Sequence, residues 1–210
     1  MKNALISFMA LSFLSFSACD ASVNRSIHVG DGERSAGLTS VNGSIHVGSS
    51  CTVEGNCRTV NGRIEIGDNS RVEELDTVNG RIVIGAGVEV DGDASTVNGS
   101  IECGAGSKVR GKVSTVNGRV ELRDAVVSDE VSTVNGDVLL SGKSVVRGGI
   151  VIKGRQGYFS RGRNLEIRIQ GGSIVEGGID VRDPERKVKV YIDKDAKVNG
   201  EIRNAKVIRK

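Results

Sequence analysis

Apolar and polar residues alternate along this chain in short stretches that recur at a constant interval. The alternation has a period of two residues, which predicts half-buried β-strands. The first column of apolar pairs is Ile45/Val47, Ile64/Ile66, Ile82/Ile84, Ile101/Cys103, Val120/Leu122 and Val138/Leu140. A second column is Val53, Val72, Val90, Val109, Val127 and Val146, and a third is Leu38, Cys57, Leu75, Ala94, Val113, Val131 and Ile150. Each repeat therefore predicts three short strands.

The repeat is marked by the motif Thr-Val-Asn-Gly, which occurs at 59–62, 77–80, 96–99, 115–118 and 133–136. Successive copies are 18 or 19 residues apart. Three strands this short cannot bury a face alone, but stacked copies can pair each strand with its equivalents about 4.8 Å above and below. The interval is too short for a β-propeller blade, and the leucine-rich pattern is missing. We therefore predict an all-β fold, a single parallel β-helix with 18- and 19-residue coils and three short strands per coil.

The Asn-Gly pairs suit the corners of such coils, because both residues tolerate tight turns. Stacked asparagine side chains can hydrogen-bond from coil to coil. We therefore interpret the repeated asparagines as a structural turn ladder rather than a ligand site: Asn42, Asn61, Asn79, Asn98, Asn117 and Asn135.

The N-terminus has the layout of a secretory signal peptide, predicted over residues 1–18. Lys2 is followed by an uncharged apolar run, 4–16, and then by the small residues Ser17 and Ala18. This run is too short for a membrane span. Residues 16–19 resemble the lipobox of bacterial lipoproteins, which implies a lipid on Cys19. Ordinary cleavage after Ser17 or Ala21 stays open. Either way, we expect an exported protein of the cell envelope, in the periplasm or anchored to a membrane.

The coils resemble two bacterial families, the polymer-forming bactofilins and exported adhesin-like β-helix proteins. The resemblance rests on the string Val-Asn-Gly-Ser-Ile at 41–45 and 97–101 and covers 23 to about 150. It implies a right-handed helix and a structural or adhesin-like role without enzymatic activity. Bactofilins are cytoplasmic and lack a signal peptide, and this chain departs from them there.

We expect residues 19–153 to form the regular repeats and 154–210 to form basic C-terminal coils and a cap of the same β-helix.

Composition weighs against an enzyme. The chain has 29 Gly, one Pro and no Trp, and three of its four Phe lie in the signal peptide. Polysaccharide-active β-helix enzymes usually build a cleft from long loops, aromatic platforms and paired carboxylates. A carbohydrate-active lyase or hydrolase is therefore kept as the alternative function. We expect no cofactor.

Histidine and cysteine side chains are the remaining candidate chemistry. His28 and His46 occupy equivalent positions in adjacent coils. They form either a weak metal site or, in the favoured interpretation, a solvated surface pair. Cys51 and Cys57 either form a disulfide, as suits an exported protein, or are two small core residues. Cys103 replaces an aliphatic strand residue and is interpreted as an inert core thiol.

Charge is unevenly distributed along the chain. Residues 20–142 contain 11 Lys and Arg against 18 Asp and Glu, whereas 143–210 contain 17 against 8. A solenoid separates such halves along its axis. Three hypotheses follow: end-to-end assembly of copies, binding of an anionic envelope polymer or glycan, or a charged cap that keeps the end soluble. The predicted ligand contacts are Arg155, Tyr158, Arg161 and Arg163. Nucleic acid is not expected, because stacking aromatics are lacking.

Overall fold

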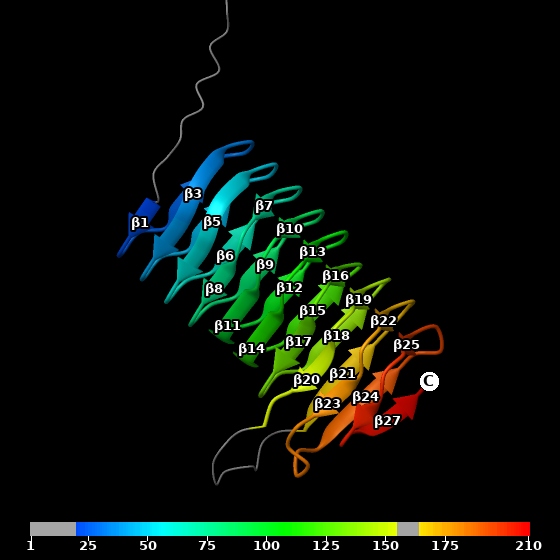
Figure 1. Cartoon of the computed structure of the whole chain (residues 1–210). Coiled ribbons are helices and arrows are strands. Elements are labelled where there is room, and N and C mark those ends of the chain that lie inside the picture. Colours follow the sequence, from blue (N-terminus) through cyan, green and yellow to red (C-terminus); the bar gives the residue numbers. More distant parts are fainter. Residues whose placement is uncertain (1–19, 155–163) are drawn as a thin grey trace, which may run out of the picture.

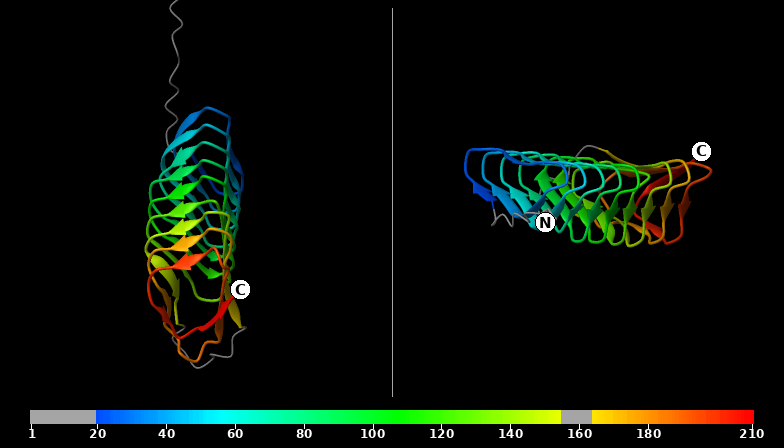
Figure 2. Two further views of the ribbon diagram at one scale, coloured as in Figure 1. Left: turned by 90° about the vertical axis from the view of Figure 1, so that its right-hand side faces the viewer. Right: turned by 90° about the horizontal axis from the view of Figure 1, so that it is seen from above.

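The computed structural model describes residues 20–154 and 164–210, and every regular element in these ranges is a β-strand. Parallel strands stack into a β-solenoid of about nine turns, with coils of roughly 19 residues. The coils follow one another along the rod from the N-terminal to the C-terminal end (Figure 1). Viewed from two further directions, the described coils form one elongated stack (Figure 2). The predicted fold class is therefore confirmed.

One side of the rod, here called the first face, is a ten-stranded parallel sheet. It contains the apolar pairs that follow each Asn-Gly corner. Its strands are β2 (Ile27–Val29), β4 (Ile45–Val47), β6 (Ile64–Ile66), β9 (Ile82–Ile84), β12 (Ile101–Cys103), β15 (Val120–Arg123), β18 (Val138–Ser141), β21 (Leu165–Ile169), β24 (Val188–Ile192) and β27 (Lys206–Arg209).

The other two sides belong to one 17-stranded sheet. The second face contains β7 (Arg71–Val72), β10 (Glu89–Val90), β13 (Lys108–Val109), β16 (Val126–Val127), β19 (Val145–Val146), β22 (Ile174–Val175) and β25 (Lys197–Val198). The third face contains β1 (Asp20–Ser22), β8 (Leu75–Thr77), β11 (Ala94–Asn98), β14 (Val113–Asn117), β17 (Glu130–Thr133), β20 (Gly149–Ile152), β23 (Ile179–Val181) and β26 (Ile202–Arg203). β3 (Arg34–Ser40) and β5 (Thr52–Thr59) run through both faces and join them.

The register reproduces the three predicted apolar columns. Ile64 pairs with Ile82 on the first face, Val53 with Val72 on the second, and Cys57 with Leu75 on the third. These side chains are almost completely buried and belong to one core cluster. Branched aliphatic side chains can fill this core because every coil presents the same positions, so layers of similar width stack directly.

The Thr and Gly of the repeated motif hold adjacent coils together at one corner. The hydroxyl of Thr115 points inward and donates a hydrogen bond to the carbonyl oxygen of Gly99 in the preceding coil, at 2.9 Å. Thr59 and Thr96 make the same bond to the glycines of their preceding coils. The backbones approach so closely that a Cβ on Gly118 would overlap the carbonyl oxygen of Gly99. Only glycine fits this position of the corner.

The asparagines form a continuous amide ladder along the same corner. Asn79 Nδ2 donates to Asn61 Oδ1 at 2.8 Å, and Asn98 Nδ2 donates to Asn79 Oδ1 at 2.8 Å. The same bond joins each of the predicted residues to its neighbour, and Asn24 is an additional first member: Asn24, Asn42, Asn61, Asn79, Asn98, Asn117 and Asn135.

A cation closes the C-terminal end of the ladder. All the bonds run in one direction, so the amide dipoles align and leave a carbonyl oxygen at Asn135. Arg186 Nη2 donates to this oxygen at 2.7 Å, although Asn135 and Arg186 are 51 residues apart. The Arg186 side chain is buried, with 7% of the residue exposed. A positive charge at the negative end of aligned dipoles is favourable for the same reason as at a helix C-terminus.

Candidate functional site

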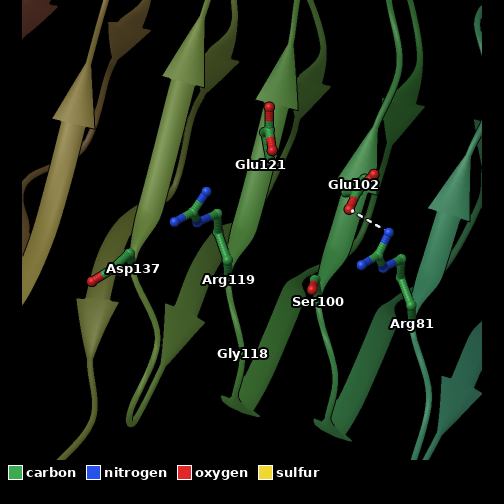
Figure 3. A pocket seen from close by; sticks show the side chains of 7 residues that line it. All are labelled: Arg81, Ser100, Glu102, Gly118, Arg119, Glu121 and Asp137. Atoms are coloured by element: carbon green, nitrogen blue, oxygen red, sulfur yellow. Dashed lines mark ion pairs between the residues drawn. The ribbon is translucent and has the colours of Figure 1, made fainter.

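A shallow polar groove lies on the first face, along the axis of the rod. Its larger part has a volume of about 370 Å³. The lining side chains project from or just before β9, β12, β15 and β18 (Figure 3). They are Arg81, Ser100, Glu102, Gly118, Arg119, Glu121 and Asp137. A smaller hollow of about 90 Å³ extends the groove toward β21 and is lined by Arg119, Asp137, Val138, Leu139, Glu166 and Arg168.

The groove's glutamates are already paired with arginines. Glu102 lies 3.3 Å from Arg81, between Oε1 and Nη1, and Glu121 Oε1 accepts a hydrogen bond from Arg123 Nε at 2.8 Å. This hydrogen bond, and secondly the negative charge of the Glu121 carboxylate, raise the pKa of Arg123. Glu166 likewise raises the pKa of Arg168, to which it is hydrogen-bonded. These pairs balance the charge of the groove's three glutamates.

Arg119 is different, because within the described residues its guanidinium has no hydrogen bond or ion pair. It lies between the Asp137 and Glu121 side chains (Figure 3) and lines both parts of the groove. The nearby Asp137 carboxylate accepts a hydrogen bond from the backbone N–H of Glu166 at 3.0 Å. Among the described residues, the groove therefore contains one guanidinium without an ion pair, beside the Asp137 carboxylate.

Glu102 and Glu121 are in register on neighbouring strands, β12 and β15. Aligning the repeats places them, with Glu65, at equivalent outward positions of the coils. The structure places all three on the first face, and it adds the groove that Glu102 and Glu121 line. The position just before each first-face strand carries Arg81, Ser100 and Arg119 in successive coils. This column is readable in the aligned repeats, but its ion pairs are not.

The histidines meet as expected from the register, because His28 pairs with His46 and His46 with Glu65. The two rings stack with centroids 4.9 Å apart and an angle of 15°. His46 Nδ1 lies 3.4 Å from Glu65 Oε2. Among the described residues, no group of three or more His, Cys, Asp or Glu side chains is arranged to hold a metal ion. The stacked geometry favours the surface pair.

The disulfide alternative for Cys51 and Cys57 is wrong in this structure, since both are free thiols. Each occupies its own inward column. Cys51 Sγ donates to the carbonyl oxygen of Gly30 at 2.9 Å, and Cys57 pairs in register with Leu38 and Leu75. The alternative of two small core residues holds. Burial raises the pKa of Cys57 and of Cys103 to about 12, so neither thiol is an activated nucleophile.

The lipidation candidate Cys19 and the predicted ligand contacts Arg155, Tyr158, Arg161 and Arg163 lie outside the described residues. Across 20–154 and 164–210, no helix has the length and apolar character needed to cross a membrane. Comparison with protein-family models, with curated proteins and with solved structures finds no match for this chain.

The last coil has a charged residue at a position that is buried in the preceding coil. Val207 pairs with the buried Val190, and Arg209 pairs with the buried Ile192. Arg209 therefore occupies a position that is inward in the preceding coil, at the open end of the stack. Inward charges at the edge of a sheet oppose pairing with a further strand.

Proposed function

We propose that this chain is a non-enzymatic rod of the cell envelope, structural or adhesin-like, that binds an acidic glycan in the groove of the first face. The observation that carries the proposal is the Arg119 guanidinium, which has no ion pair within 20–154 and 164–210, in a groove whose glutamates are already paired. A carboxylate of an acidic sugar would bind the Arg119 guanidinium through a bidentate pair. The acidic glycan proposed here is a specific case of the anionic envelope polymer that the sequence led us to expect as a partner.

The shape of the groove suits a linear chain of sugars. Its lining residues come from five successive coils, between Arg81 and Arg168. With about 4.8 Å between coils, this corresponds to a length of about 19 Å. Sugar hydroxyls both donate and accept hydrogen bonds, and Ser100 with the groove carboxylates offers both kinds of partner. Leu139 adds an apolar contact for a sugar ring.

The signal peptide and the lipid on Cys19 support an envelope location from the sequence. β1 begins at Asp20, directly after Cys19. A lipid at this residue would tether the rod by its first coil and leave the first face accessible. Loss of membrane association on Cys19→Ser, with export retained, is the expected result of fractionation.

The alternative, a polysaccharide lyase or hydrolase, is favoured by one observation, the register of Glu102 and Glu121 on adjacent strands. Glycosidases use two neighbouring carboxyl groups, one of which must hold a proton. Here each carboxylate has its own arginine partner, which favours the binding function. Release of reducing sugars from polygalacturonate, abolished by Glu121→Gln, would establish the enzyme instead.

Of the three hypotheses on the charged end, the last coil favours the charged cap. Direct stacking of a second copy would place Arg209 in line with Val29 of its first coil and bury an unpaired charge. Electron microscopy of the mature protein at low and high salt tests this, because filaments that shorten in salt would support end-to-end assembly.

The decisive experiment is calorimetric titration of the mature protein with hexagalacturonate and, for comparison, the neutral maltohexaose. We expect binding of the acidic hexamer only, weakened about 10- to 100-fold by Arg119→Gln, the range of one charged hydrogen-bonded pair. Arg147→Gln is the matched control, an exposed arginine on the second-face side with no ion partner among the described residues. Equal losses in both variants, or no binding of the acidic hexamer, would overturn the proposal.

A further inference from the structure

The tripeptide Val-Asn-Gly occurs seven times in this chain, and its seventh copy stands apart from the others. The first six copies place their asparagines in the amide ladder, at the corner between the third and first faces. The seventh copy, 198–200, lies between β25 and β26, at the corner between the second and third faces. The same local sequence is therefore found in two structural settings, and Asn199 is outside the ladder.

Asparagine is chemically labile, above all when glycine follows it. The backbone nitrogen of the glycine gives up its proton to hydroxide and attacks Cγ, the carbonyl carbon of the asparagine side chain. A C–N bond forms, the bond from Cγ to Nδ2 breaks, and Nδ2 takes up a proton and leaves as ammonia. Water then opens the resulting succinimide ring at either carbonyl carbon, which gives aspartate or isoaspartate. Glycine favours the reaction because it has no side chain to hinder the approach.

The ladder opposes this reaction at its own asparagines. Asn79 Nδ2 donates to Asn61 Oδ1, and Asn79 Oδ1 accepts from Asn98 Nδ2, each at 2.8 Å. Both polar atoms of the reacting amide are thus bonded to neighbouring coils, and rotation of the amide toward the Gly80 nitrogen would break both bonds. The glycines that follow the ladder asparagines are buried or half-buried, which limits the access of hydroxide to their N–H groups.

Asn199 lacks these restraints. Among the described residues, its side chain has no hydrogen bond. The residue aligned with it in the preceding coil is Glu176 rather than another asparagine. Asn199 and Gly200 are both exposed, so water and hydroxide can reach the reacting atoms. One restraint remains, because the Gly200 N–H donates to the carbonyl oxygen of Gly177 at 3.1 Å.

We propose that Asn199 is a site of spontaneous deamidation in the folded protein, whereas the six ladder asparagines are protected. Reaction at a ladder residue must break two side-chain hydrogen bonds, while reaction at Asn199 must break one backbone hydrogen bond. A difference of one hydrogen bond corresponds to about fivefold in rate. The exposure of Gly200 increases this difference.

Isoaspartate at position 199 would weaken the last coil selectively. It lengthens the main chain by one carbon between β25, which pairs with β22, and β26, which pairs with β23. Across the same corner, the N–H groups of Asn199 and Gly200 donate to the carbonyl oxygens of Val175 and Gly177. A longer main chain cannot keep both pairings in register. Since each coil contacts only its neighbours, the modification loosens the end of the rod as the molecule ages and leaves the earlier coils unchanged.

Mass spectrometry of the mature protein tests the proposal, with the six ladder copies as internal controls of matched sequence. The folded protein is incubated at pH 9 and 37 °C, and deamidation at each Asn-Gly pair is measured on peptides generated at acidic pH. We expect Asn199 to react at least about fivefold faster than each ladder asparagine. In concentrated urea all seven should react at similar rates. Equal rates in the folded protein, or the same excess at Asn199 in urea, would overturn the proposal.

The variant Arg186→Leu tests the protective effect of the ladder bonds separately. Asn135 Oδ1 accepts from Arg186, and Asn135 Nδ2 donates to Asn117. Removing the first of these bonds should raise deamidation at Asn135 by about fivefold. Asn61 in the same variant is the control and should react as slowly as before. An unchanged rate at Asn135 would refute protection by the ladder. Neither measurement involves the glycan, so either proposal can fail without the other.

Discussion

Replacing one ladder asparagine by its isosteric acid tests whether the amide ladder stabilises the rod. Asn79 both donates to Asn61 and accepts from Asn98. In Asn79→Asp, the accepted bond persists, but the donor becomes a carboxylate oxygen that faces Asn61 Oδ1. The same substitution at Asn24 removes no donated ladder bond among the described residues, because Asn24 only accepts from Asn42 there. Asn24→Asp is therefore the matched control.

The expected difference is set by one lost hydrogen bond and one repulsive contact. A hydrogen bond contributes about 1 kcal/mol net, and an acceptor left facing another acceptor costs about 1 kcal/mol or more. Asn79→Asp should therefore destabilise by about 2–3 kcal/mol, and Asn24→Asp by less than about 0.5 kcal/mol. For a chain of this size, this corresponds to a melting temperature lower by about 4–10 °C.

Thermal unfolding followed by circular dichroism at pH 7 and pH 3 measures both variants. At pH 3 the carboxyl of Asn79→Asp is protonated and regains a donor, so most of its loss relative to Asn24→Asp should disappear. The comparison between the two variants removes the titration of other groups. Equal stability of the two variants at pH 7 would show that the ladder does not contribute, and an unchanged difference at pH 3 would refute the hydrogen-bond explanation.

Further predictions concern the corners, the thiols and the cation at the end of the ladder. Gly118→Ala should destabilise by about 3 kcal/mol or more, because its Cβ would overlap the Gly99 carbonyl oxygen, whereas Gly172→Ala, whose nearest contact is 3.7 Å, should change stability by less than about 0.5 kcal/mol in urea unfolding. Burial raises the pKa of Cys57 and Cys103 from 9.0 to about 12. The two thiols ionise more easily in the unfolded chain, so their contribution to the free energy of unfolding is complete below pH 9 and is lost as the pH rises toward 12. Stability should therefore fall by about 2.7 kcal/mol per pH unit in this window, and Cys57→Ala/Cys103→Ala should abolish that slope. Arg186→Leu should cost about 1.5–3 kcal/mol through the loss of its bond to Asn135 Oδ1, and a stability equal to wild type would contradict the dipole explanation.

The sequence by itself determined the repeating part of this protein. Because each coil contacts its neighbours at an offset of 18 or 19 residues, the inward columns and the asparagine ladder follow directly from aligning the copies. The position of His28 beside His46 follows in the same way. One offset describes all these contacts, so a pattern along the chain becomes a pattern along the rod.

Only the tertiary structure decided the features that depend on side-chain direction or break the repeat. Cys51 and Cys57 are close in sequence, but they occupy separate inward columns and remain free. Among the described residues, Arg119 has no ion pair whereas Arg81 pairs with Glu102, although the two arginines stand at equivalent positions, because long side chains can contact several different neighbours. Arg186 reaches Asn135 across 51 residues, an offset that no repeat predicts. The repeat determines the backbone and its core, whereas charge pairing on the surface depends on rotamers and on contacts between coils that differ.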